Sequence, residues 1–248
     1  ELGENVLELN GLSGHGFSDV NLTVKKGSIV GLTGLQGSGS SELLQGLFGV
    51  VPVTGGTLKV SGKECRIHGI QGAMKAGIAM LASNRKENSV IPDMSILENM
   101  YLSEQVLSAR QPLISAGKER ERYEKYKKLL SIKAADPKDP ITSLSGGNQQ
   151  KVFLARWLNT EAGILLLDNP TQGIDVGAKA EIYKLILKLA DAGKTILINT
   201  LEIPELAKVA DCCAVFYEGT IIKMLQHEEI DEKTVMLYST NAAQKGES

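Results

Sequence analysis

Two stretches near the start of the chain alternate apolar and polar residues in the manner of half-buried strands. Residues 6–9 read Val-Leu-Glu-Leu, and residues 20–24 read Val-Asn-Leu-Thr-Val. Because successive side chains of a strand point to opposite faces, this period of two predicts one covered and one open face. Antiparallel sheets commonly have this character, so we expect an antiparallel edge sheet here.

Four other stretches are apolar almost throughout, which favours strands buried on both faces of a parallel sheet. These stretches are residues 28–33, 77–82, 163–168 and 195–199. Helical patterns lie between them, at residues 42–48, 71–75, 149–158 and 176–190. Strands that alternate with helices in this way predict an α/β fold.

The remaining pattern predicts smaller elements. Residues 55–63 indicate a turn and an exposed strand, and residues 213–217 and 220–224 indicate a hairpin around Glu218-Gly219. A last helix is expected from about residue 228 to 238. The tail, residues 241–248, is polar, and we expect it to be mobile.

Size and composition narrow the function classes. The chain has 248 residues, 42% of them apolar, which suffices for the core of one α/β domain, with or without an inserted lobe. The net charge of −2, with acids and bases mixed, gives no electrostatic case for a nucleic-acid partner. The longest apolar runs are far shorter than the roughly 20 residues of a membrane span. The chain begins with Glu1 rather than Met, and we expect a domain cut from something longer.

The three cysteines give no sign of a metal site or a disulfide framework. Cys212 and Cys213 are adjacent, a spacing at which good disulfide geometry is hard to reach, and Cys65 lies far away in sequence. We interpret all three as reduced thiols of a cytosolic protein.

A glycine-rich loop joins the strand at 28–33 to the helix at 42–48. Strand, glycine loop and helix are the context of a phosphate-binding P-loop, whose pattern is Gly, four residues, Gly, Lys and then Ser or Thr. Gly34, Gly39 and Ser41 fit that pattern, but Ser40 stands where the lysine belongs. Taken alone, the loop could also be a tight βα turn. The candidate nucleotide-binding residues are Gly34, Leu35, Gln36, Gly37, Ser38, Gly39, Ser40 and Ser41.

A second candidate site opens the helix at 149–158. Residues 144–151 read Leu-Ser-Gly-Gly-Asn-Gln-Gln-Lys. Glycines let a backbone approach a ligand closely, and a helix start offers free N–H groups and a positive dipole end. Together with a serine hydroxyl they form an anion clamp. The candidates are Ser145, Gly146, Gly147, Asn148 and Gln149.

The buried stretch at 163–168 ends in a carboxylate, Asp168. At the carboxyl end of a parallel strand, this residue could hold Mg²⁺ through water, with the Ser41 hydroxyl as a second ligand. As a lone feature, Asp168 could instead cap a helix.

The eight residues 144–151 resemble the signature motif of ABC-type ATPases, in the form that is typical of sugar-importer ATP-binding proteins. The resemblance covers essentially the whole chain. It implies a P-loop NTPase core with a mixed sheet, an antiparallel β subdomain and an inserted α-helical subdomain at about 87–140. Residues 1–248 would then form a single nucleotide-binding domain. The charged stretch 118–130 belongs to that inserted part, although by itself it predicts only a solvated helix.

The resemblance also implies roles for the candidate residues. In this family the signature clamps the γ-phosphate of an ATP held by the opposite domain, and a D-loop crosses the dimer interface. Residues 171–175 resemble that D-loop, which adds Asp175 to the residues that serve the partner's nucleotide. Among such proteins, the motif sequences most resemble those of the second, C-terminal half of ribose-, galactoside- or xylose-type import ATPases.

Four positions depart from the family pattern, and each serves the domain's own nucleotide. Ser40 replaces the P-loop lysine, and Ser83 stands where a glutamine or glutamate senses Mg²⁺. Asn169 takes the place of the catalytic glutamate, and Leu201 that of the switch histidine. An amide cannot accept a proton, and general-base help is worth roughly 10²–10⁴-fold in rate. Phe17, the one aromatic residue available to stack on adenine, suits a core position better.

We therefore expect an asymmetric dimer whose other half binds ATP and Mg²⁺ and supplies the base and the histidine. This half would donate the signature while its own site is impaired, within an ATP-driven importer of sugars or similar small solutes. Its partners would be the second ABC half, on the same full-length chain, and permease subunits that dock on the helical part. Its place would be peripheral, at the cytoplasmic face of the membrane. Two alternatives remain open at this point, a self-sufficient ATPase and a nucleotide-sensing scaffold without transport.

Overall fold

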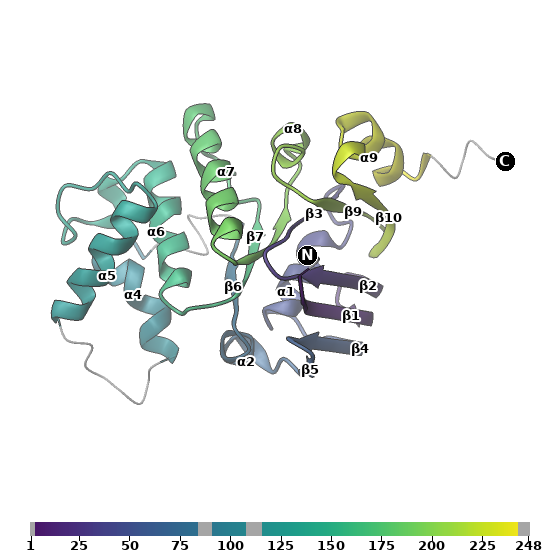
Figure 1. The fold of residues 1–248 in the computed structure, drawn as a ribbon, viewed down its shortest axis with the longest axis horizontal. Helices are drawn as coiled ribbons and strands as arrows, with labels where there is room; N and C mark the ends of the chain where they lie inside the picture. The colour runs from purple at the N-terminus through teal and green to yellow at the C-terminus, as the bar shows by residue number, and fades with distance from the viewer. Residues whose placement is uncertain (1–2, 84–90, 108–115, 243–248) are drawn as a thin grey trace.

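A mixed six-stranded sheet forms the centre of the molecule. The computed structural model describes residues 3–83, 91–107 and 116–242. The sheet order is β10-β9-β3-β8-β7-β6, with every neighbouring pair parallel except β9 and β10 (Figure 1). Its strands are β3 (Ile29–Gly34), β6 (Ile78–Leu81), β7 (Ile164–Asp168), β8 (Thr195–Asn199), β9 (Cys212–Tyr217) and β10 (Thr220–Gln226). The four apolar stretches thus form parallel strands as predicted, and the expected hairpin is β9–β10.

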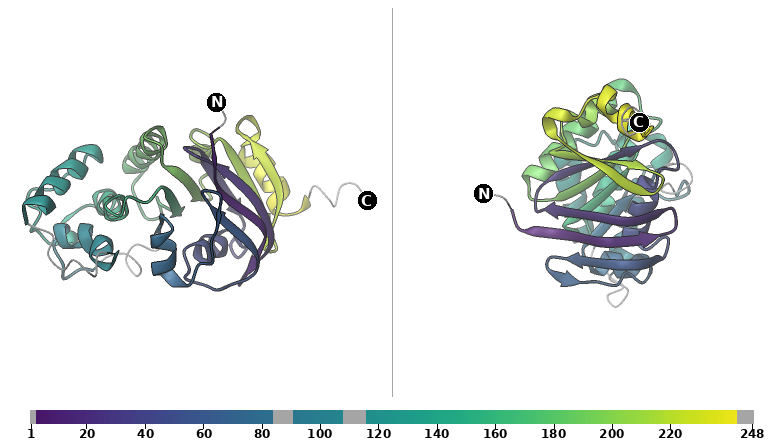
Figure 2. Two further views of the ribbon diagram at one scale, coloured as in Figure 1. Left: turned by 60° about the horizontal axis from the view of Figure 1, so that its bottom comes forward. Right: turned by 90° about the vertical axis from the view of Figure 1, so that its right-hand side faces the viewer.

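A second, antiparallel sheet lies across one end of the molecule (Figure 2). It is ordered β2-β1-β4-β5, and its strands are β1 (Asn5–Gly14), β2 (Phe17–Lys25), β4 (Val53–Val60) and β5 (Lys63–Glu64). Helix α1 (Ser40–Leu47) packs in one apolar cluster with residues of both sheets, through its buried Leu43, Leu44 and Leu47. The glycine loop before α1 is therefore anchored at the junction of the two sheets.

A second apolar cluster covers the other face of the mixed sheet. It contains residues from helices α6 (Gly146–Leu158), α7 (Val176–Asp191), α8 (Ile203–Leu206) and α9 (Glu232–Ser239). Helix α2 (Gly69–Lys75) belongs to the first cluster instead, through Ala73 and Met74. No helix within the described residues is long and apolar enough to cross a membrane.

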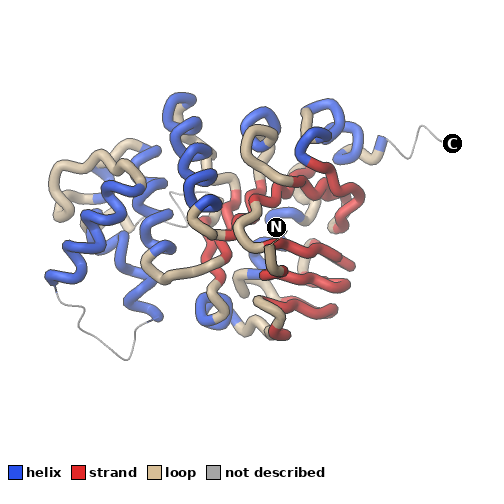
Figure 3. Tube along the Cα trace, in the orientation of Figure 1, coloured by secondary structure: helices blue, strands red, loops and turns tan. Residues whose placement is uncertain are grey.

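Helices gather at the end of the molecule away from the antiparallel sheet (Figure 3). They are α4 (Ile96–Leu107), α5 (Ala116–Leu129) and the first part of α6, with the short 3-10 turn η1 (Ile141–Ser143). A second 3-10 turn, η2 (His227–Glu229), lies elsewhere, after β10. A capping box starts α4: Glu98 accepts a hydrogen bond from the Ser95 N–H at 2.8 Å and donates its own N–H to the Ser95 hydroxyl at 3.2 Å. This confirms a helical part; the subdomain boundaries at 87–140 stay a prediction, and residues 87–90 and 108–115 lie outside the described residues.

Helices α4 and α6 are joined by a buried polar contact. Arg156 donates from Nε to the Asn99 carbonyl at 2.6 Å and from Nη2 to the Asn99 side-chain oxygen at 3.0 Å. Burial lowers the pKa of Arg156 to about 10. Asn99 in turn donates to the carbonyls of Ile91, Met94 and Ser95, so the segment that enters α4 is tied to the helix that carries the signature.

Some sequence expectations need correction. Gly55 and Gly56 lie inside β4 rather than in a turn, because β4 stays paired with β1 on both sides of them, with Gly55 opposite Ser13 and a register shift between Gly55 and Thr57. The last helix begins at Glu232, since residues 227–229 form the 3-10 turn η2. Phe17 is 2% exposed, as expected of a core residue. The three cysteines are free thiols, and of the tail predicted to be mobile only residues 241–242 lie within the described residues.

Candidate functional site

The glycine loop is closed on one side and open on the other. A Cβ on Gly39 (φ +102°) would lie 2.6 Å from the Gly16 carbonyl, and one on Gly34 would lie 2.6 Å from the Phe216 carbonyl. At Gly37 (φ +78°) a Cβ would meet nothing within 4 Å. The two outer glycines are therefore required by packing, while the middle of the loop faces open space as a phosphate cradle does.

Asp168 is a buried acidic residue beneath this loop. The carboxylate is 1% exposed and accepts from the Ser41 hydroxyl at 2.6 Å, from Asn199 Nδ2 at 2.7 Å and from Asn169 Nδ2 at 3.4 Å. Asn199 lies opposite Asp168 in the β7–β8 register. These three donors are side chains rather than backbone N–H groups of a helix start, which does not fit the alternative of a helix cap.

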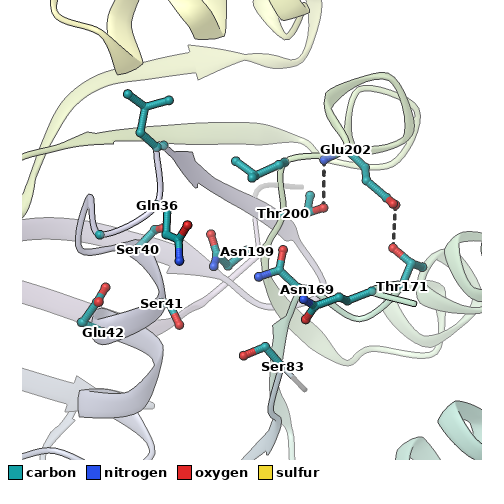
Figure 4. Close-up of a pocket in the computed structure, with 15 residues that line it drawn as sticks. Gln36, Ser40, Ser41, Glu42, Ser83, Asn169, Thr171, Asn199, Thr200 and Glu202 are labelled. Carbon is teal, nitrogen blue, oxygen red and sulfur yellow. Dashed lines mark hydrogen bonds between the residues drawn. The ribbon is translucent and has the colours of Figure 1, made fainter. Parts of the chain in front are cut away.

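These groups border a cleft of about 540 Å³, called here the glycine-loop cleft (Figure 4). The side-chain amides of Gln36, Asn169 and Asn199 point toward one another across it, and Ser83 lies beside them. The residues that line it are Gly34, Leu35, Gln36, Gly37, Ser40, Ser41, Glu42, Ser83, Asn169, Thr171, Gln172, Asn199, Thr200, Leu201 and Glu202. This described lining contains two carboxylates and no lysine, arginine or histidine.

The composition of the lining decides how well Mg-ATP fits here. The loop backbone and the start of α1 suit a phosphate. A triphosphate, however, also needs cationic partners, and the described lining offers Glu42 and Glu202 instead. Asp168 and Ser41 are close enough to share a metal, but in the structure they bond each other. The described side chains of this cleft therefore do not fit a tightly held Mg-ATP.

The rim beyond β8 is held rigidly around an exposed leucine. Leu201 is 64% exposed. The next residue, Glu202, accepts from Thr171 Oγ1 at 2.6 Å and forms an ion pair with Lys179, and its N–H donates to Thr200 Oγ1 at 3.1 Å. Burial alone would raise the pKa of Glu202, but the hydrogen bonds from Lys179 and Thr171 outweigh it and lower that pKa.

The second group of candidates surrounds a separate cleft of about 300 Å³, called here the signature cleft. Ser145 is the N-cap of α6, and its hydroxyl accepts from Asn148 Nδ2 at 3.0 Å. Asn148 Oδ1 accepts from the Lys133 N–H at 2.8 Å, and Gln149 Nε2 donates to the Leu144 carbonyl at 2.9 Å. The start of α6 is thus fixed on both sides by side-chain hydrogen bonds.

The start of α7 borders the same cleft. Asp175 is the N-cap of α7, accepting from the Ala178 N–H at 2.9 Å. The two helices pack closely, because a Cβ on Gly147 would lie 2.8 Å from the Ala178 Cβ. Lys151 Nζ donates to Glu181 at 2.7 Å and to the Ser131 carbonyl at 3.3 Å, which ties α6 to α7 and to the loop after α5.

The structure therefore sorts the predicted residues into two places. Ser41, Asn169 and Leu201 line the glycine-loop cleft together with Gly34–Gly37 and Ser40, and Asp168 lies beneath them, hydrogen-bonded to Ser41 and Asn169. Ser145 to Gln149 and Asp175 lie instead at the starts of α6 and α7. The two lining sets share no residue. Within the described residues, no group of three or more His, Cys, Asp or Glu side chains could hold a metal ion.

Three residues at the two clefts were not among the candidates predicted from the sequence. Asn199 is signalled only by being the polar end of a buried strand, and Glu202 only by following it. Lys151 falls within the signature string, but nothing in its spacing indicates a partner in α7.

Known protein families and curated proteins include clear matches to this chain. A model of the ABC transporter family matches residues 17–172, more than half of the chain. The ribose import ATP-binding protein RbsA of Rhodococcus jostii is 41% identical over 98% of this chain and 48% of its own length. The arabinose import ATP-binding protein AraG of Vibrio parahaemolyticus is 39% identical over 95% of this chain and 47% of its own length. The chain thus spans about half the length of these curated relatives.

Solved structures show the same fold. A nucleotide-free ATP-binding cassette from an ABC transporter superposes with a TM-score of 0.81 at 22% identity, covering 94% of this chain and 98% of that one. The dimeric structure of a bacterial ABC transporter cassette gives 0.76 at 22% identity, covering 89% and 98%. With the mixed sheet, the antiparallel sheet and the helical part all in place, the chain belongs to the ABC transporter family as an ATP-binding domain with the ABC ATPase fold.

Proposed function

We propose that this chain is one nucleotide-binding half of an ATP-driven importer of sugars or similar small solutes. Its signature cleft would hold the ATP bound by a partner half, while its own glycine-loop cleft is impaired in hydrolysis. The motif sequences of the chain resemble those of the C-terminal half of a protein that carries two ABC halves. The sugar class rests on the relatives, which are named for ribose and arabinose import.

The observation that carries the proposal is the contrast between the two clefts. The signature cleft has its helix caps in place at Ser145 and Asp175 and is bordered by Lys133 and Lys151. The described lining of the glycine-loop cleft has no cation, and at the position of the base Asn169 donates a hydrogen bond to Asp168. An amide cannot take a proton from water, and a leucine at the switch position cannot bond a phosphate.

The residues of this chain would act on the partner's nucleotide by position and charge. ATP supplies the phosphoryl group, whose negative charge the protein must stabilise. The free N–H groups at the start of α6 and the Ser145 hydroxyl would meet it, with the positive end of the α6 dipole behind them. Asp175 would hold the start of α7 beside that point, at the dimer interface.

The remaining parts follow from the same proposal. The helical part, about residues 87–140, would receive a membrane permease, since it projects from the core at the end away from the antiparallel sheet (Figure 1). The domain would then be peripheral at the cytoplasmic face of the membrane. The single-domain extent of 1–248 belongs to this proposal too.

The decisive experiment is Ser145→Arg in the assembled ATP-binding protein that contains this domain and its partner half. An arginine at the helix start blocks the clamp, so ATP turnover should fall on the order of 10²-fold or more. Ser18→Arg, on the exposed side of β2, is the matched control and should leave turnover unchanged. Unchanged turnover in Ser145→Arg would reject signature donation, and Mg-dependent turnover by this chain alone would favour a self-sufficient ATPase.

A further inference from the structure

A further cleft lies between the end of α5 and the side of α7, and we call it the α5–α7 groove. Its volume is about 190 Å³. Its described lining contains four lysines and one carboxylate, in a chain whose net charge is −2. The lining residues are Leu129, Leu130, Ser131, Lys133, Lys151, Glu181, Lys184, Leu185 and Lys188.

The one carboxylate of this described lining is already paired. Lys151 is buried, with 5% of its side chain exposed, and it donates from Nζ to Glu181 at 2.7 Å. This hydrogen bond lowers the pKa of Glu181, and the charges of Lys151 and Lys133 lower that pKa further. Lys133 is therefore close enough to act on the groove, but within the described residues its ammonium group forms no ion pair.

Two lysines of α7 also lack a counter-ion in the part of the chain that the structure describes. Lys184 and Lys188 are exposed and one helical turn apart, and neither forms an ion pair there. Like charges at this spacing on a helix repel each other. Lys133 reaches the same groove from the loop after α5, so unpaired ammonium groups from two elements surround it. Such a cluster attracts an anion.

The residue types of the groove suit a phosphate with an organic part. An ammonium group is a compact charge that suits a phosphate, whereas arginine provides planar recognition of carboxylates, and the described lining contains no arginine. The Ser131 hydroxyl can donate as well. Leu129, 43% exposed, and the adjacent Leu185 offer an apolar wall to the carbon atoms of a ligand. The groove is much smaller than the glycine-loop cleft of about 540 Å³, so the ligand must be small.

The groove is distinct from the phosphate-binding part of the signature cleft. Lys133, Lys151 and Glu181 line both, but Ser145 and Gly147, at the start of α6, line only the signature cleft. The Lys151–Glu181 ion pair thus stands at the border between the two. A ligand of the groove is therefore not the ATP of the proposed function.

We propose that the α5–α7 groove binds a small phosphate monoester. The phosphate lies among the ammonium groups of Lys133, Lys184 and Lys188, and the organic part lies against Leu129 and Leu185. This inference goes beyond the proposed function, because it concerns this chain alone and needs neither ATP nor a partner half. The same chemistry occurs in a free phosphate ester and in the headgroup of an anionic lipid, and the experiment separates the two.

The test measures the binding of glycerol 3-phosphate to this chain by calorimetric titration. Lys184→Gln combined with Lys188→Gln should weaken the affinity at least about 10-fold, because the two substitutions remove charged hydrogen bonds. Lys63→Gln combined with Lys233→Gln is the matched control, since these lysines are also exposed but lie in β5 and α9. The control variant should bind as tightly as the unmodified chain does.

A second measurement locates the ligand, because the glycine loop can also hold a phosphate. Glycerol 3-phosphate should protect Lys184 and Lys188 of the unmodified chain from acetylation, as read by mass spectrometry. Lys63 and Lys233 should stay equally reactive with and without the ligand.

Several outcomes would overturn the inference. Equal affinity of the unmodified chain and the Lys184/Lys188 variant, or no protection at about 10 mM ligand, would show that the groove is not the site. Equal binding of inorganic phosphate would reject the organic part, and equal binding of glycerol would reject the phosphate. Protection by phosphatidylglycerol vesicles but not by free glycerol 3-phosphate would assign these lysines to a membrane surface.

Discussion

Two helices of this chain begin beside a cleft, but the side chains around the two starts differ. Helix α6 begins with a side-chain cap at Ser145 and is braced by Lys151 and Asn148. Helix α1 begins at Gly39 without a side-chain cap, above a carboxylate and beside a lining of amides and hydroxyls. The loop of α1 keeps its shape because Gly34 and Gly39 are needed for packing, whereas nothing in the fold requires a lysine at position 40. The backbone geometry of this loop therefore does not depend on which side chain stands at position 40.

The largest expected effect comes from placing a lysine at position 40 of the glycine loop. Ser40→Lys should tighten Mg-ATP binding by this chain by roughly 10–150-fold, because charged hydrogen bonds are worth about 1.5–3 kcal/mol each. Calorimetric titration measures this, with Ser18→Lys as a control for added charge on the surface. Tight binding already in the unmodified chain would mean that the backbone cradle suffices, and the contrast between the clefts would then be one of hydrolysis only.

The next effect concerns the signature cleft. Gly147→Val should lower the free energy of unfolding by about 1–3 kcal/mol, because the new side chain meets Ala178 where α6 and α7 pack. Gly117→Val, in α5, is the matched control, since a Cβ there would meet nothing within 4 Å. Denaturant titration of both variants decides the matter. Equal stabilities would show that α6 can shift away from α7 at little cost.

The smallest expected effect is a pH dependence of the unfolding free energy that comes from Glu202 at the glycine-loop cleft. Because the pKa of Glu202 is lowered in the folded chain, its stabilisation is present above the unfolded value near 4.5 and is lost as the pH falls through the folded pKa. The unmodified chain should exceed Glu202→Gln in unfolding free energy by about 1 kcal/mol or less at pH 7, a gap that narrows toward pH 3. Unfolding titrations at a series of pH values measure the gap. A constant gap would assign it to shape rather than charge.

Most of the fold follows from hydrophobic period alone. The alternating residues of β1 and β2 and the apolar runs of β3, β7 and β8 predict their strands, because burial on one face or on two leaves a distinct pattern. Element ends were less predictable where hydrogen-bond pairing rather than hydrophobicity sets them, as at Gly55 in β4 and Glu232 in α9.

The candidate site was predictable only in part. Asp168 and Ser41 could be placed together because strand, loop and helix order brings them to one edge of the sheet. Asn199 could not, since its contact with Asp168 depends on which strand lies beside β7, and strand order is not written in local sequence. The same holds for Glu202 and Lys151, whose partners Lys179 and Glu181 both lie in α7.

The close approach of Gly147 to Ala178 has a mechanical consequence. The Lys151–Glu181 ion pair also links the two helices, so the beginnings of α6 and α7 are joined both by packing and by charge. Because the two helix starts are in contact, we expect a displacement of one to displace the other, which would couple the positions of Ser145 and Asp175. Under the proposed function, a partner half that pressed on residues 171–175 would thereby also shift Ser145 at the start of α6.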